Sequence, residues 1–427
     1  TYRPEFVHTW GGRSYHNQIT LNRLSNRESL FMVAHLLGTQ EIDKELEKLI
    51  LEKTEGIPFF IEELLKSLVD LKVIERKDSQ YRLIKDIKTV TIPSTIQDMI
   101  MARVDSLPDA TRTVLQTGSV IEREFPYDLI KRVTGLSEQQ LLTHLSALKD
   151  SELLYERGIY PQTSYIFRHA LTREVVYDSI LAKKKKELHE EIGKGIEELY
   201  KDSLAEYYGV LAEHFFVSEN YAKAAEYSRM AGRKAEKAAS FPDAISNAKK
   251  GVACLERLPQ TDEVQKKIIN ARTALGLYFI QLNYPVKAKE AVDPIIDVAL
   301  KIGYKHRLPI INTILGAYEF EVEENFPKAL DHLEEALKIS EETKDILSLF
   351  FTNYFLGLAL MWNCAFEKAS YHFEKALEIN MVANSLWGIS AMKTFLSYVN
   401  LLQGNIDLGY KASEEALHMA EDSGDIY

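Results

Sequence analysis

The sequence has 427 residues, too many for a single hydrophobic core, and its length predicts roughly two to four domains. Apolar residues make up 46% of it and charged residues 27%, the balance of an ordinary globular protein, and no apolar run is long enough for a membrane helix. The net charge of −11 argues against a general nucleic-acid binder, because neutralising phosphates needs clustered lysine and arginine.

Three helices and a hairpin are predicted for the first part of the sequence. A helical pattern begins near Ser29, and a second covers about 42–54. Gly56 ends this second helix, and Pro58 opens the third, where a missing amide hydrogen costs little. Residues 73–83 place a polar turn between two short apolar segments, which is typical of a β-hairpin.

A different pattern begins at Pro93. Two apolar runs, 153–156 and 165–168, predict a second hairpin, and a further helix starts at about His169. Three helices closed by a hairpin are the plan of a winged helix. The helix that would read DNA in such a domain is acidic, so we expect it to pack inside the protein. The predicted helices before the hairpin cover about 95–106, 108–121, 127–134 and 137–151.

From about Leu204 onward the sequence repeats, with a period of 40 or 41 residues in its most regular part. Small residues in both helices of each pair let the two backbones approach, and a large residue such as Leu333 or Phe373 fills the space beside them. One pair cannot bury its apolar face alone, so stacked pairs share a continuous core. The small residues are Gly276, Gly316, Gly357 and Ser397 in the first helices, and Ala288, Ala329, Ala369 and Gly409 in the second.

The repeats resemble the tetratricopeptide family in its long version. The preceding residues resemble the region that follows the nucleotide-binding core in signal-transduction ATPases with numerous domains (STAND ATPases, AAA-like). The closest subgroup is the ATPase and repeat region of bacterial class III adenylate or guanylate cyclases. The resemblance rests on the stretches TYRPEF, QITLNRL, EGIPFFIEEL and FRHALTRE, at residues 1–6, 18–24, 55–64 and 167–174.

The resemblance implies a mainly α fold: a helical lid and a winged-helix domain, followed by a right-handed α-solenoid of tetratricopeptide-like helix pairs. We therefore expect the end of a nucleotide-binding core at 1–25, a lid with a hairpin at 26–90, a winged-helix domain at 91–200 and helical repeats at 201–427. The first residues carry neither a starting Met nor a secretion signal, so we expect the sequence to be the carboxy-terminal half of a larger cytoplasmic protein.

Four residues are carried over from the family as nucleotide contacts. Arg3 would sense the terminal phosphate, since a guanidinium fork matches phosphate oxygens, or it is a surface arginine. Gly56 and Pro58 would pack against the adenine base, or they only stop one helix and start the next. His169 would contact the diphosphate at a helix start, although Ala170 replaces the usual Asp beside it, or it is a structural histidine.

No complete active site is visible in the sequence. It contains no phosphate-binding loop of the Gly-x-x-x-x-Gly-Lys-Ser/Thr type, no acidic pair for magnesium, and no nucleophile or protease motif. Cys254 and Cys364 indicate neither a disulfide framework nor a zinc site. We expect ATP or ADP, with its Mg²⁺, to be held mainly by an upstream core. The resemblance implies that the parent protein is an ATPase, with an adenylate or guanylate cyclase as a further option.

The main hypothesis is therefore a regulatory module. Lid and winged helix would close over the nucleotide, and the concave face of the repeats would bind a protein or a small molecule to control an attached effector such as a nucleotide cyclase. Neither nucleic acid nor membrane is expected as a partner. The alternatives are a repeat scaffold that binds proteins without nucleotide, or part of a transcription activator. A phosphate-binding loop upstream of Thr1 would separate the first two hypotheses.

Overall fold

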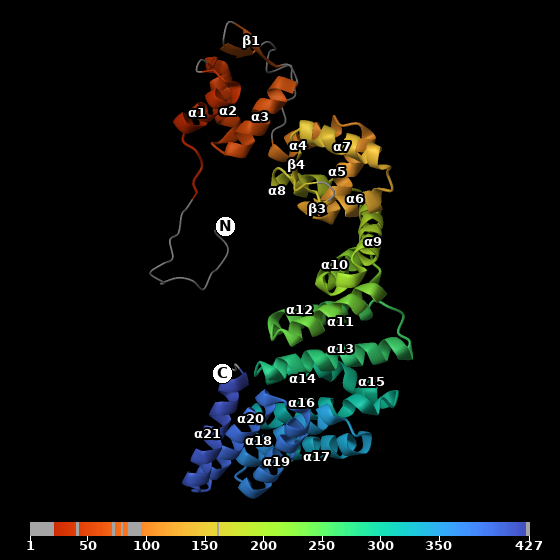
Figure 1. Ribbon diagram of the computed structural model, residues 1–427, viewed down its shortest axis with the longest axis vertical. Coiled ribbons are helices and arrows are strands. Elements are labelled where there is room, and N and C mark those ends of the chain that lie inside the picture. Colours follow the sequence, from red (N-terminus) through yellow and green to blue (C-terminus); the bar gives the residue numbers. More distant parts are fainter. Residues whose placement is uncertain are drawn as a thin grey trace. The chain divides into compact units, whose positions relative to one another are not determined.

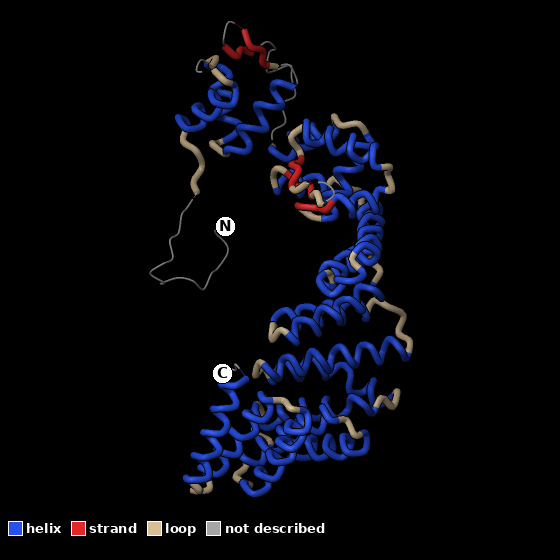
Figure 2. Tube along the Cα trace, in the orientation of Figure 1, coloured by secondary structure: helices blue, strands red, loops and turns tan. Residues whose placement is uncertain are grey.

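The computed structural model describes residues 21–39, 42–70, 73–77, 80–83, 95–159 and 162–423. Within these residues the chain is mainly α-helical, as predicted, and its few strands lie in the first of two compact units, residues 1–185 and 186–427 (Figure 1, Figure 2). None of the described helices combines the length and apolarity that a membrane crossing requires. Pro93 and the start of the predicted winged-helix domain lie outside the described residues.

Three helices and a two-stranded hairpin open the first unit. A capping box between Ser25 and Glu28 starts the first helix three residues before the predicted Ser29, and Gly38 ends it in the left-handed conformation. The hairpin pairs its strands antiparallel, as predicted. One apolar core, which includes Ile50 and Leu64, joins the three helices. The elements are α1 (Asn26–Leu37), α2 (Lys44–Thr54), α3 (Pro58–Asp70), β1 (Ile74–Lys77) and β2 (Gln80–Leu83).

The second part of this unit is a winged helix with one more strand than predicted. Strand β3 joins the predicted hairpin in an antiparallel sheet of order β3-β5-β4. Its Phe125 is fully buried, and a side chain at Gly118 would come within 2.6 Å of the Phe125 ring. The elements are α4 (Ile96–Asp105), α5 (Asp109–Ile121), β3 (Glu124–Pro126), α6 (Tyr127–Thr134), α7 (Glu138–Asp150), β4 (Leu154–Arg157), β5 (Ser164–Phe167) and α8 (Ala170–Asp178).

The second unit stacks helix after helix, and successive helices of the regular repeats pack in pairs. Helix α9 (Ala182–Leu199) leads into it from the first unit. The others are α10 (Tyr208–Val217), α11 (Tyr221–Lys237), α12 (Phe241–Leu255), α13 (Asp262–Gln281), α14 (Pro285–Val292), α15 (Ile296–Lys301), α16 (Leu308–Glu321), α17 (Phe326–Thr343), α18 (Ile346–Trp362), α19 (Phe366–Ala383), α20 (Leu386–Leu402) and α21 (Ile406–Ser423), with short 3-10 turns η2 (Lys201–Glu206), η3 (Asp293–Ile295) and η4 (Lys305–Arg307).

The repeated glycines mark the places where paired helices come closest. A side chain at Gly316 would come within 2.6 Å of Leu333, and one at Gly357 within 2.5 Å of Phe373. Leu333 and Phe373 are fully buried, so the large residue fills the space that each glycine leaves, as predicted.

The last helix pair has different small residues at the two repeated positions. Ser397 stands in α20 where the earlier pairs have Gly, and Gly409 stands in α21 where they have Ala. The Ser397 hydroxyl donates to the carbonyl oxygen of Gly409 at 2.7 Å, and a side chain at Gly409 would lie 3.2 Å from the Ser397 carbonyl oxygen. The nearest atom to such a side chain would be Cγ of Leu401 at 2.8 Å, so the departure of Gly409 from the repeat pattern leaves room for Leu401.

Candidate functional site

Gly56 forms the turn that leads into α3. Its φ of +73° lies in the left-handed region, and its carbonyl oxygen accepts a hydrogen bond from the Leu24 amide at 2.8 Å. A side chain at this position would lie 2.2 Å from the Leu24 carbonyl oxygen. In this structure the backbone that Gly56 allows to come close is therefore that of Leu24, in one of the stretches that carry the family resemblance.

The Gly-x-Pro element and His169 meet through Phe59. Pro58 is the first residue of α3 and is exposed. The next residue, Phe59, stacks on the His169 ring with 3.8 Å between the centroids and 28° between the planes. The structure describes three of the predicted contact residues, and two of them, Pro58 and His169, lie next to the Phe59 ring. Arg3, the remaining prediction, lies outside the described residues.

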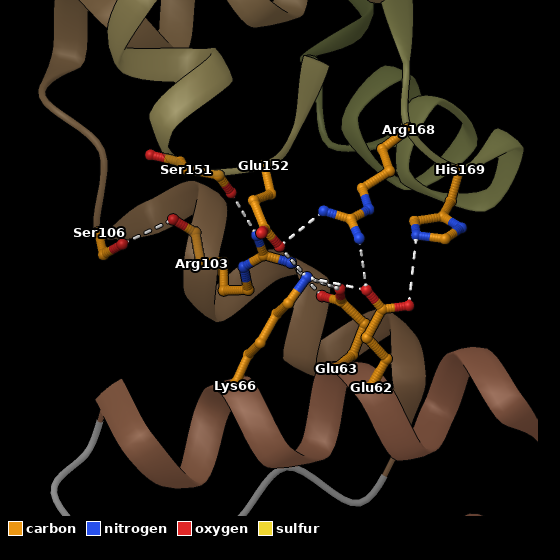
Figure 3. A network of polar contacts seen from close by, with 9 residues as sticks. All are labelled: Glu62, Glu63, Lys66, Arg103, Ser106, Ser151, Glu152, Arg168 and His169. Atoms are coloured by element: carbon orange, nitrogen blue, oxygen red, sulfur yellow. Dashed lines mark hydrogen bonds and ion pairs between the residues drawn. The ribbon is translucent and has the colours of Figure 1, made fainter. Parts of the chain in front are cut away.

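His169 is the residue that precedes α8, but its ring does not cap that helix. Its Nε2 atom is buried without a hydrogen-bond partner, and the nearest carboxylate oxygen, Oε2 of Glu62, is 3.9 Å away (Figure 3). Burial lowers the pKa of His169 below its ordinary value, although the nearby Glu62 and Glu63 act to raise it. The lowered pKa favours the neutral ring, in which one of the two nitrogens carries a hydrogen that it can donate.

Three charged side chains of α3 face the winged helix (Figure 3). Glu63 is only 1% exposed and pairs with Arg103 of α4, whose other terminal nitrogen donates to the Ser151 carbonyl oxygen. Glu62 accepts from Arg168 at 2.8 Å and from Lys66 at 3.1 Å. Because these pairs connect α3 to α4 and to the end of β5, they fix the lid against the winged helix.

Glu152 closes the network from the turn after α7. It pairs with Lys66 and, at 2.7 Å, with Arg168. The hydrogen bond from Lys66 lowers the pKa of Glu152 below its ordinary value. Glu152 also has a φ of +53°, uncommon for a residue with a side chain, so backbone strain is accepted where this carboxylate is placed. The charges balance, because the acidic residues Glu62, Glu63 and Glu152 meet the basic residues Lys66, Arg103 and Arg168.

Sequence reasoning missed this network, although its signal was present. Glu62 and Glu63 interrupt the apolar run of α3, and adjacent acids on a helix otherwise buried in a core require partners. The partners could not be named because they lie far along the chain, with Arg168 106 residues after Glu62.

Acidification is expected to destabilise the first unit in two steps. The folded-state pKa of His169 lies below its ordinary value of 6.5, so the folded form binds fewer protons and loses stability as the pH falls below 6.5. The pKa of Glu152 lies below 4.5, so its stabilisation is lost only in stronger acid. Calorimetric unfolding between pH 7.5 and 5.5 should show that His169→Gln weakens the first step and that His144→Gln does not. Equal pH profiles for wild type and His169→Gln would contradict this assignment.

Four of the basic residues near the winged helix already have partners within the described chain. In α7, Lys149 pairs with Glu156, and His144 lies 3.0 Å from the Thr111 hydroxyl. In α9, Lys185 lies 3.9 Å from the centre of the Tyr177 ring, and Lys186 pairs with Glu219 at 2.7 Å. In the described ranges no three His, Cys, Asp or Glu side chains gather as a metal site would require.

Comparison with known proteins gives one domain match and several structural likenesses. Residues 25–82, which hold Gly56, Pro58 and the α3 charges, match a domain of unknown function, DUF8739. No curated protein matches the sequence. One solved structure is BtubC (BKLC) from P. vanneervenii, which is 14% identical with a TM-score of 0.38, over 58% of this chain and 94% of that protein. Another is a Rap protein complexed with competence and sporulation factor, also 14% identical, with a TM-score of 0.42 over 77% of this chain and 78% of that protein.

A stronger likeness is to a STAND protein with a tetratricopeptide repeat sensor from Pyrococcus horikoshii. The two are 14% identical with a TM-score of 0.51, over 94% of this chain and 54% of that protein. The present chain thus spans about half the length of the protein it matches. At this identity the likeness concerns the fold alone, and the chain shares the fold of a STAND protein with a repeat sensor over nearly all of its length.

Proposed function

We propose that this chain is the regulatory and sensor half of a nucleotide-dependent signal-transduction protein. Its lid and winged helix would close on ATP or ADP, with Mg²⁺, held by a phosphate-binding core in a longer polypeptide. The repeats would bind a protein or small ligand and so control an attached effector, such as a nucleotide cyclase. The proposal rests on the Nε2 atom of His169, which is buried and has no hydrogen-bond partner. The His169 ring lies beside the Gly-x-Pro element, because it stacks on Phe59.

The surroundings of His169 suit a phosphate oxygen. A neutral imidazole can donate one hydrogen bond, and the free amides at the start of α8 favour an anion. Glu62 would repel a phosphate, but Arg168 and Lys66 already neutralise it at 2.8 Å and 3.1 Å. A bound nucleotide would also add contacts to both sides of the lid and winged-helix interface, so its identity could bias an equilibrium between closed and open forms.

The test is ADP retention by the longer protein that this proposal requires. His169→Ala should weaken ADP binding by about ten- to a hundredfold, the loss expected when one hydrogen bond to a charged group is removed. His144→Ala is the matched control, since it removes a winged-helix histidine whose ring already has Thr111 as a partner. The measurement is ADP affinity by calorimetry, with circular dichroism as a check on folding.

Two outcomes would count against the proposal. Unchanged ADP affinity in a folded His169→Ala variant removes this residue from the nucleotide site. A longer protein that binds no adenine or guanine nucleotide removes the switch itself, and the helical repeats would then support a protein-binding scaffold.

A further inference from the structure

The second unit contains a cavity of about 680 Å³ between α11, α12 and α13. Cavities that hold small molecules measure roughly 300–1,000 Å³, so this one has room for a metabolite-sized ligand. These three helices follow one another in the stack (Figure 1). Small residues form much of its wall, together with aliphatic side chains: Ala225, Gly232, Ala248, Gly251, Ala271, Ala274, Leu255, Leu258 and Leu277.

Close helix packing does not explain the two glycines in this wall. A side chain at Gly232 would meet no atom closer than 3.6 Å, and one at Gly251 none closer than 3.5 Å, which are ordinary contacts. At Gly316, by contrast, the same addition would come within 2.6 Å of Leu333. A glycine inside a helix costs about 1 kcal/mol relative to alanine. Both glycines line the cavity, which larger residues at these positions would narrow.

The charge of the wall is opposite to that of the chain. Five basic side chains and two acidic ones line the cavity, whereas the whole sequence carries a net charge of −11. Arg229 and Arg233 lie one turn apart on α11, and neither forms an ion pair or hydrogen bond with any residue that the structure describes. Free guanidinium groups in a wall with more basic than acidic side chains favour an anionic ligand.

Arg307 is held in a fixed orientation at this wall. Its Nε atom donates to the Asn270 side-chain oxygen at 2.6 Å, and the same oxygen accepts from the Tyr304 hydroxyl at 3.3 Å. Its two terminal nitrogens have no acceptor among the described residues. The guanidinium groups of Arg229, Arg233 and Arg307 therefore carry donor nitrogens at this cavity that nothing in the described chain satisfies.

We propose that this cavity binds a small organic acid. Its carboxylate or other acid group pairs with the guanidinium groups of Arg229, Arg233 and Arg307, and its apolar body lies on the small and aliphatic residues of the wall. This proposal rests on the proposed function in one respect, because it names the chemical class that the repeat sensor recognises. It is tested without nucleotide, so it can fail while the ADP prediction stands, and the reverse also holds.

The experiment compares three probes that have the same alkyl chain and differ in the charge of their head group. Octanoate, octanol and octylammonium are titrated by calorimetry into the 427-residue protein. Octanoate should bind at least about tenfold more tightly than the other two, because only it can pair with a guanidinium. The double variant Arg229→Gln/Arg307→Gln should abolish this preference and leave octanol binding unchanged. Lys301→Gln is the control, since it removes an exposed positive charge that lies outside the cavity.

A second variant tests the place of binding. Gly232→Leu should weaken all three probes, because the new side chain occupies the cavity. Octanoate binding no tighter than that of octanol would overturn the proposal, as would a preference for octanoate that survives in the double variant. Binding of hexaglutamate by a protein that ignores octanoate would also overturn it, and would assign the basic wall to an acidic protein segment.

Discussion

Replacing Arg103 by methionine should destabilise the first unit by about 3–5 kcal/mol, the usual cost of leaving a buried charge without its partner. Glu63, its partner on α3, is 1% exposed, and its next cation, Lys66, is 3.8 Å away. The same substitution also leaves the Ser151 carbonyl oxygen without this donor. The measurement is hydrogen exchange of the amides in α3, α4 and α7, which reports the free energy of opening for each helix.

Two further variants separate the buried charge from the loss of a long side chain. Arg112→Met should cost less than about 1 kcal/mol, because Arg112 pairs with exposed carboxylates. Combining Arg103→Met with Glu63→Gln should recover part of the lost stability, since the carboxylate is then no longer charged. If Arg103→Met costs no more than Arg112→Met, the network does not hold the lid against the winged helix.

Gly56→Ala should destabilise the first unit by more than about 3 kcal/mol, well beyond the roughly 1 kcal/mol of a left-handed backbone position alone. The new methyl group would lie 2.2 Å from the Leu24 carbonyl oxygen, so the segment around Leu24 must move. Hydrogen exchange of the Leu24 amide, which donates to Gly56, should rise sharply. A loss of nucleotide binding in this variant would follow from that displacement and would not show contact with a base.

Gly38→Ala is the matched control for Gly56→Ala. Gly38 has a φ of +65°, close to the +73° of Gly56, but a side chain there would meet no atom within 4 Å. Both variants therefore share the backbone penalty, and only one creates the clash. Equal effects of the two substitutions would show that the approach of Leu24 is not needed for stability.

The sequence was most informative where one physical pattern repeats. Gly316 and Gly357 recur at a fixed spacing with a large residue at a fixed distance, so their packing could be predicted from a one-dimensional pattern. Strand β3 escaped prediction because three residues ending in Pro126 show no alternation, and their place depends on pairing with β5 some forty residues later. The same limit applies to the charges around Glu63, whose partners only folding brings near.

The same distinction applies to the candidate site. Gly56, Pro58 and His169 were recognised as family motifs, but not the stacking of Phe59 on His169, because a ring contact between distant segments leaves no local pattern. Nor could the motif tell what Gly56 approaches, since a glycine signals only that space or a positive φ is needed there.

The residues at 397 and 409, which both differ from the earlier repeats, bear on how such repeats change over time. The Ser397 hydroxyl donates to the Gly409 carbonyl oxygen, and the absence of a side chain at Gly409 leaves room for Leu401 of the same helix pair. Searches that score each position separately would count Ser397 and Gly409 as two unrelated departures, although one hydrogen bond joins them.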